Sequence, residues 1–280
     1  MILNILISVF LFVFGVCIGS FLNVVIYRLE VGKNLSGRSF CPHCKHTLKW
    51  QDLFPVFSFL FLGGKCRYCK QKISWQYPLV ELATGLMFLL IFNKFWIPAF
   101  AGMTAGMVAM IISLAFLFYI SSVLVIIFVY DLKHYIIPDK VLLPAIFVAF
   151  LYRLVGILWI PAFAGMTTDK IASLCNYFFA VLVASGFFFL IWLVSKGKWM
   201  GFGDVKLAVL MGLLLGLQNV LVALFLAFFF GAIIGVILMI GQKKGLKSEI
   251  PFGPFLITGT FVALLWGNQL INLYLKLFLF

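Results

Sequence analysis

The chain has 280 residues, of which 65% are hydrophobic and only 10% are charged, and its formal net charge is +13. Soluble domains are about 45–50% apolar and about 25% charged, so this composition excludes a water-soluble fold and indicates a protein embedded in lipid. The positive charge does not indicate a nucleic-acid partner. The basic residues lie in short segments between apolar runs, as they do when they set membrane topology.

Eight apolar segments predict an all-α polytopic membrane protein with about eight transmembrane helices, since a span needs about 20 apolar residues. The first is followed, not preceded, by positive charge at Arg28, so we expect a retained helix instead of a cleaved signal. The sixth is short and nearly joined to the seventh, which leaves a re-entrant pair open. The segments are residues 4–26, 77–93, 106–130, 141–158, 172–194, 205–217, 219–241 and 252–273.

Alternating these segments across a membrane gives a strong charge bias. The connecting segments on one side hold 17 of the 21 Lys and Arg residues. Basic segments of this kind face the cytoplasm, so both termini are expected on the extracytoplasmic side. The segments assigned to the cytoplasm are residues 28–76, 131–140, 195–206 and 242–249.

Four cysteines lie in the cytoplasmic segment 28–76, as Cys41-Pro-His-Cys44 and Cys66-Arg-Tyr-Cys69. Two Cys-x-x-Cys pairs can hold one Zn²⁺ tetrahedrally, and disulfides are disfavoured on the cytoplasmic side. Four thiolates leave no position for water, so we predict a structural zinc in a small loop domain. His43 and His46 are not needed as ligands. A loop with few apolar residues gains much of its folding energy from such a metal.

Two of the eight acidic residues lie at the ends of apolar runs. Asp131 ends one run and Asp204 opens another, both at the cytoplasmic ends of their segments. An acid in a membrane span is costly and is a functional candidate by default. Two adjacent carboxyl groups share one proton, so the ionised one takes a proton from water while the protonated one activates a peptide carbonyl. This pattern predicts a metal-free aspartyl protease.

Gly201 and Gly203 precede Asp204 and are expected to let the backbone bend and approach a substrate there. A structural interpretation of Asp204 is also open, because an acid at a helix N-terminus is a good cap. The same interpretation suits Asp131 poorly, since an acid at a helix C-terminus opposes the helix dipole.

A nine-residue repeat occurs twice without change, from Trp96 to Thr104 and from Trp159 to Thr167. Both copies fall in segments expected to be extracytoplasmic loops, residues 94–105 and 159–170. We interpret them as insertions at two tolerant loops, because added loop length costs little free energy. A paired binding loop is the alternative.

Taken together, the motifs resemble those of the bacterial type IV prepilin peptidases, and the resemblance runs nearly end to end. One departure is Glu30, where the first signature of that family continues with proline. The matching stretches are Gly19–Leu29, Cys41–Cys69, Ile73–Leu82, Asp131–Asp139, Gly201–Leu207 and Glu249–Phe255.

The resemblance implies an enzyme of the bacterial inner membrane that removes the basic leader of prepilins and pseudopilins at the cytoplasmic face. It also implies N-methylation of the new N-terminal residue with S-adenosylmethionine. Membrane lipid and these substrates are the expected partners, and nucleic acid is not. The region 1–93, with two helices and the cysteine loop, is associated with methylation, and 106–273 with proteolysis.

The resemblance also implies roles for single residues. Asp131 and Asp204 correspond to the catalytic pair of the family, and Gly201, Gly203 and Lys206 fall in the second catalytic motif, which is expected to form an active-site loop. Apart from the resemblance, the position of Glu81 one turn into the second span leaves two roles open, pairing with a basic residue of the loop or substrate binding. Glu249 is also expected to contribute to substrate binding. The sequence identifies no residues for S-adenosylmethionine.

Three other interpretations stay open: a peptidase without methylation, a zinc-loop transporter, and a structural component of a secretion apparatus. A transporter predicts acids near the bilayer midplane, whereas Asp131 and Asp204 lie at segment ends. A structural component predicts that an Asp204→Asn protein still supports processing.

Overall fold

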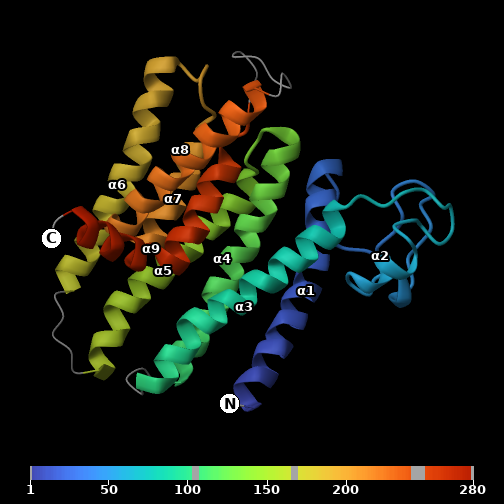
Figure 1. Cartoon of the computed structure of the whole chain (residues 1–280), viewed down its shortest axis with the longest axis horizontal. Coiled ribbons are helices and arrows are strands. Elements are labelled where there is room, and N and C mark those ends of the chain that lie inside the picture. Colours follow the sequence, from blue (N-terminus) through green and yellow to red (C-terminus); the bar gives the residue numbers. More distant parts are fainter. Residues whose placement is uncertain (1, 103–106, 165–169, 241–249, 279–280) are drawn as a thin grey trace. The chain divides into compact units, whose positions relative to one another are not determined.

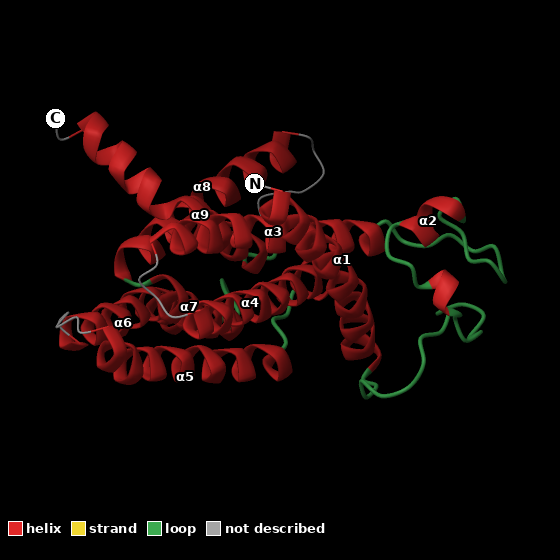
Figure 2. Cartoon of the chain, turned by 90° about the horizontal axis from the view of Figure 1, so that it is seen from below, coloured by secondary structure: helices red, strands yellow, loops and turns green. Residues whose placement is uncertain are grey.

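The computed structural model describes residues 2–102, 107–164, 170–240 and 250–278, and most of this chain is helical (Figure 1). Within the described ranges no strand is present, and two isolated β-bridges lie between α1 and α3 (Figure 2). The long helices are α1 (Ile2–Val31), α3 (Gln76–Gly102), α4 (Met107–His134), α5 (Asp139–Ala164), α6 (Lys170–Ser195), α7 (Phe202–Leu215), α8 (Leu217–Ile240) and α9 (Gly253–Phe278).

These eight long helices coincide with the eight apolar segments of the sequence, and the predicted all-α membrane fold class is confirmed. Six of them, among the described residues, are long and apolar enough to cross a membrane: α1, α3, α4, α6, α8 and α9. The chain is therefore a multi-pass membrane protein. With 14 residues, α7 is about 21 Å long, which is less than the roughly 30 Å of a hydrocarbon core.

The two predicted loops that carry the repeat are partly helical. α3 continues to Gly102 and α5 to Ala164, so the first part of each copy extends a helix. In lipid, the backbone satisfies its own polar groups by staying helical, and this part of the repeat is apolar. The prediction of loops is therefore wrong for residues 94–102 and 159–164. Residues 103–105 and 165–169 lie outside the described residues.

The chain divides into two compact units, Met1–Ile126 and Ile127–Phe280, and the division falls inside α4. In the first unit α1 packs closely against α3. A Cβ atom added to Gly19 would lie 2.7 Å from the Cα atom of Glu81, and one added to Gly85 would lie 2.6 Å from Cγ2 of Val16. Small residues thus let the two backbones approach, as is common between helices in membranes.

The segment between α1 and α3 carries the soluble part of this unit. It contains the short 3₁₀ helix η1 (Trp50–Asp52) and the five-residue helix α2 (Phe57–Phe61), and is otherwise loop (Figure 2). At the end of α1, buried Arg28 donates hydrogen bonds to the backbone carbonyls of Asn34, Leu35 and Gly37. These bonds fix how the chain leaves the first helix.

In the second unit α7 is surrounded by other helices, since it contacts α5, α6, α8 and α9. Ten residues of this helix are buried, from Asp204 to Leu215. It ends at Gly216, which has a φ of +74°, and α8 begins at the next residue. The sixth and seventh apolar segments are therefore separate helices joined by one glycine.

Arg153 of α5 closes the C-terminal end of α7. Its guanidinium donates to the carbonyls of Leu213 at 2.8 Å and Leu214 at 2.6 Å, and it lies 4.1 Å from the ring centre of Tyr177. The last carbonyls of a helix have no partner within that helix. Arg153 supplies these partners, which matters for a short helix enclosed by protein.

Candidate functional site

The carboxyl group of Asp131 lies where one helix ends and another begins. Asp131 belongs to the last turn of α4, and the helix stops where Tyr135 adopts a φ of +58°. Asp131 is 4% exposed and accepts a hydrogen bond from the backbone N–H of Gly253, the first residue of α9. A helix N-terminus carries partial positive charge and unpaired N–H groups. α9 therefore offsets the unfavourable place of this acid at the end of α4.

Asp204 lies in the first turn of α7 and is also buried. Its carboxyl group is near enough to that of Asp131 for their charges to repel each other. Ile137 packs against Gly203, next to Asp204, and against Gly253, next to Asp131. A Cβ atom added to Gly203 would lie 2.9 Å from Cβ of Ile137, and one added to Gly253 would lie 3.5 Å from its Cδ1. The structure thus brings together the two acids that the sequence selects, beside an apolar side chain.

Gly201 and Gly203 have ordinary backbone conformations before Asp204. Gly201 has a φ of −72°, which any residue adopts, and an added Cβ atom would have no neighbour closer than 3.9 Å. Gly203 is helical, and its missing side chain makes room for Ile137. Gly203 thus acts through close packing here, and the expected bending of the backbone near a substrate stays a prediction.

Lys206 lies inside α7 instead of in a loop, and it forms an ion pair with Asp139. Its Nζ atom is 2.7 Å and 2.8 Å from the two carboxylate oxygens of Asp139, the first residue of α5. The side chains are 26% and 52% exposed, so solvent limits the pair to about 0–1 kcal/mol of stability. The pair joins the first residue of α5 to the N-terminal part of α7.

Glu81 lies in the first unit and fastens the loop to α3. Its Oε2 atom accepts the backbone N–H of Val56 at 2.7 Å. Val56 has a φ of +61°, and the N–H of Phe57 bonds the carbonyl of Pro55 at 2.6 Å, which defines a strained γ-turn. Glu81 therefore binds the backbone of the loop, and not a basic side chain of the loop as the sequence suggests. Glu249 lies outside the described residues.

The four predicted cysteine ligands converge in the first unit. The sulfur atoms of Cys41, Cys44, Cys66 and Cys69 all lie within 4.8 Å of one another, and those of Cys41 and Cys69 are 3.9 Å apart. Zn–S bonds of about 2.3 Å in a tetrahedron place the sulfur atoms about 3.8 Å apart. The cluster therefore has the donor set and the spacing of a site that holds zinc.

Each cysteine pair is presented by the same backbone turn. The N–H of Lys45 donates to the carbonyl of Cys41 at 2.9 Å, and that of Lys70 donates to the carbonyl of Cys66 at 3.0 Å. Lys45 and Lys70 have φ values of +59° and +60°. The site is thus assembled from two equivalent knuckles, each contributing two sulfur atoms.

Two of the four thiols, those of Cys66 and Cys69, have shifted pKa values. Hydrogen bonds from the backbone, first that of Cys69, lower the pKa of Cys66 to about 7. The N–H of Gln71 favours the thiolate of Cys69, but burial and the neighbouring thiol groups outweigh it and raise the pKa of Cys69 to about 11. Several thiolates in one place repel each other, and a bound divalent metal removes this obstacle.

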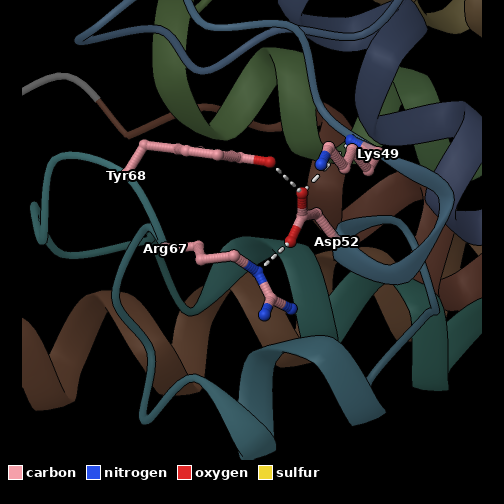
Figure 3. Close-up of polar contacts among 4 residues, drawn as sticks. All are labelled: Lys49, Asp52, Arg67 and Tyr68. Carbon is pink, nitrogen blue, oxygen red and sulfur yellow. Dashed lines mark hydrogen bonds and ion pairs between the residues drawn. The ribbon is translucent and has the colours of Figure 1, made fainter.

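Asp52 ties the second knuckle to the segment that connects the two knuckles, as Figure 3 shows. Its carboxylate accepts hydrogen bonds from Nε of Arg67 at 2.7 Å, from the hydroxyl of Tyr68 at 3.1 Å and from the backbone N–H of Lys49 at 3.1 Å. Burial raises the pKa of Asp52, but these bonds outweigh it and the pKa is lowered. The ring of Tyr68 also lies 3.7 Å from that of His46 between ring centres.

Three contributors to these sites are not identified by sequence reasoning. Gly253 belongs to a matched stretch, but only the fold reveals that its N–H reaches Asp131. Ile137 is an ordinary apolar residue whose place against Gly203 and Gly253 leaves no sequence signal. The role of Asp52 also needs the loop conformation, because its partners Arg67 and Tyr68 lie far along the chain.

Comparisons with known proteins cover nearly the whole chain. Residues 13–95 match the bacterial peptidase A24 N-terminal domain, and residues 117–236 match the type IV leader peptidase family. The chain is 32% identical to the prepilin leader peptidase/N-methyltransferase of Stutzerimonas stutzeri, over 94% of this chain and 92% of that protein. It is 31% identical to the protein of the same description from Bacillus subtilis, over 95% and 97%. No solved structure matches the chain.

Proposed function

Because the chain belongs to the type IV leader peptidase family, we propose that Asp131 and Asp204 are the carboxylates with which it removes the leader peptides of prepilins. The observation that carries this proposal is the meeting of two buried carboxyl groups, from the end of α4 and the start of α7. The relatives named above are enzymes, which favours this function over a transporter or a purely structural component.

The geometry supports a division of labour between the two acids. The N–H of Gly253 at the start of α9 stabilises a negative charge on Asp131, so Asp131 takes a proton from the attacking water. Asp204 then carries the shared proton and gives it to the carbonyl oxygen of the scissile bond. When the tetrahedral intermediate collapses, the C–N bond breaks and a carboxyl group returns a proton to the leaving amine.

The second activity follows from the relatives, whose names include N-methyltransferase. The methyl donor of such a reaction is S-adenosylmethionine, which supplies a methyl group to the new N-terminal amine. We assign this activity to the N-terminal region 1–93, since residues 13–95 match a separate domain description. No residue of this region is assigned to the donor.

The cysteine cluster is proposed as a structural zinc site with the ligands Cys41, Cys44, Cys66 and Cys69. Four sulfur ligands complete a tetrahedral shell, so the metal orders the loop and activates no water. Asp52 and Glu81 then tie this loop together and to α3.

We propose the cellular location and the orientation of the protein from its charge distribution together with its family. The strongly basic segments face the cytoplasm of a bacterium, the termini lie outside, and the protein belongs to the inner membrane. Pseudopilins, whose leaders are of the same kind, are the second proposed substrate class. Glu249 stays a proposed substrate-binding residue on the sequence pattern alone.

The test is cleavage of a prepilin by the full-length protein in detergent, followed by gel shift and by the mass of the new N-terminus. Wild-type protein is compared with Asp131→Asn, Asp204→Asn and, as a matched acid outside the pair, Asp139→Asn. We expect the two dyad variants, Asp131→Asn and Asp204→Asn, to lose at least about 10⁴-fold in kcat while remaining folded. Asp139→Asn is expected to cleave. S-adenosylmethionine in the assay adds one methyl mass to the product.

Retained cleavage in either dyad variant removes that residue from the mechanism. If Asp139→Asn loses as much cleavage as the other two variants, the loss is not specific to Asp131 and Asp204 and does not support their assignment. A product of correct mass without the methyl group favours a peptidase that lacks the second activity.

A further inference from the structure

A groove in the second unit adjoins the proposed active site and has no part in the mechanism above. Its volume is about 490 Å³, within the roughly 300–1,000 Å³ of typical ligand pockets. Faces of three helices line it. They include Phe128 and Leu132 of α4, Phe230, Ile234 and Leu238 of α8, and Phe255 of α9.

The groove is lined by residues next to Asp131 and Gly253 in the chain. Phe128 and Leu132 flank Asp131 on α4. Gly253, whose N–H bonds that carboxylate, is followed by Pro254, which also lines the groove. A peptide whose scissile bond lies at Asp131 therefore has this groove as a path for the adjoining residues.

The lining selects apolar side chains. Among the described residues, no charged side chain contributes to it. The hydroxyl of Thr258 is turned to its own helix, where it donates to the carbonyl of Pro254 at 2.8 Å. A charged group here would lose its hydration without a partner. An aliphatic or aromatic side chain would instead gain about 25 cal/mol for each Å² that leaves water.

The length of the groove indicates a segment and not a single side chain. Phe230, Ile234 and Leu238 lie four residues apart on one face of α8. They extend about 12 Å along the helix axis, at about 1.5 Å per residue.

We propose that this groove binds the apolar stretch of the substrate beside the scissile bond, several residues long with bulky aliphatic or aromatic side chains. The proposal rests on the proposed function, because it needs a peptide cut at Asp131. Holding the chain next to the reacting bond supplies orientation, which is a large part of catalysis. A lipid acyl chain is the competing occupant.

Two isoleucines of α8 offer a matched comparison, because Ile233 and Ile234 are each 42% exposed and only Ile234 lines the groove. p-Benzoylphenylalanine is placed at either position in full-length Asp204→Asn protein, which retains uncleaved prepilin. After illumination in bilayers, we expect position 234 to crosslink the apolar residues next to the scissile bond, and position 233 to crosslink lipid. Crosslinks from 234 to lipid alone, or equal substrate crosslinks from both, overturn the proposal.

A kinetic comparison separates this proposal from the proposed function. Ile234→Trp fills the groove, and we expect it to raise KM for prepilin about tenfold with little change in kcat. Ile233→Trp is expected to leave both unchanged. An equal KM for both variants overturns the groove proposal while the proposed function stands. Absence of cleavage by wild-type protein counts against the proposed function, and the crosslinks still decide the occupant.

Discussion

The position of Asp131 makes sense only when two helices are considered. It is unfavourable in α4 and favourable against the first N–H of α9. A hydrogen bond to a carboxylate from a helix N-terminus both holds the group and stabilises its charge. Gly253 is therefore as much a part of the site as the acid itself.

The contact between Gly253 and Asp131 predicts what a methyl group added at residue 253 would do. In Gly253→Ala the added Cβ atom would collide with Oδ2 of Asp131 and lie 3.2 Å from its Cγ. A displacement of about 1 Å in an active site can cost roughly 100-fold in rate, so we expect kcat for prepilin cleavage to fall by about that factor. Cleavage kinetics in detergent measure it.

Gly235→Ala is the matched control, because a Cβ atom there would meet nothing within 4 Å. It is expected to cleave at the wild-type rate. A Gly253→Ala protein that is as active as this control would show that Asp131 tolerates displacement.

At this scale the sequence predicts the chemical groups better than their surroundings. Aspartates and cysteines carry their chemistry in their identity and spacing, and the cysteines converge as the sequence predicts. The surroundings depend on tertiary contacts, which a one-dimensional pattern does not contain. Gly203 illustrates this, because its close contact with Ile137 leaves no trace in the sequence pattern.

At the scale of elements, α7 carries one catalytic candidate and ends inside protein. Two of its C-terminal carbonyls, those of Leu213 and Leu214, accept hydrogen bonds from Arg153. Asn176 of α6 takes part as well, since its Oδ1 accepts the N–H of Leu217 at 3.2 Å. Side chains of neighbouring helices thus finish a helix that is too short to reach the membrane surface on its own.

We expect Arg153→Met to destabilise the protein, because it leaves two carbonyls without their donor while keeping an apolar stem. An unsatisfied buried polar group costs about 1–3 kcal/mol, so a loss of about 2–4 kcal/mol is expected. Thermal unfolding in detergent measures it. Arg153→Lys, which keeps one donor group, is expected to lose less. Equal stability of wild type and Arg153→Met would show that these carbonyls find other partners.

The eight long helices are predictable because each is an apolar run with polar ends. The boundaries of these helices are less predictable. α3 and α5 run into the repeat because its first residues are apolar and lipid favours continued helix. The exact fit of α1 against α3 also lies beyond pattern alone, since it depends on which glycines face each other.

At the scale of the whole molecule, the cysteine cluster and the aspartate pair belong to different compact units. If the zinc orders the first unit, its removal should affect methylation more than cleavage. We expect Cys41→Ser with Cys66→Ser to lose zinc, from about one ion per chain to near zero, as measured by elemental analysis. Methyl transfer should then fall by a larger factor than prepilin cleavage.

A Cys17→Ser protein provides the control, because Cys17 lies in α1 away from the four-sulfur cluster. It should keep its zinc and both activities. Zinc retained by the double variant would contradict the assigned ligands, and equal loss of both activities would contradict the separation of roles.

The charge bias predicts the topology of the whole chain. Alkaline phosphatase, which is active outside the cytoplasm, is fused after Leu35 in the loop or after Lys276 near the C-terminus. We expect the second fusion to be active and the first inactive, since basic segments stay inside. Activity of the first fusion would reverse the orientation, and inactivity of the second would place the C-terminus inside.

The repeated backbone turn of the cysteine knuckles has a consequence for assembly and for divergence. Each knuckle sets its own two sulfur atoms through a local turn, at Lys45 and at Lys70. Neither half therefore needs the other to be in place before it captures an ion. The connecting chain has to let the halves meet, and the entropy of that closure grows slowly with length. Mutation can thus lengthen the connection at little cost where it leaves Asp52 and Val56 in place, whereas a single insertion inside either knuckle would dismantle the centre.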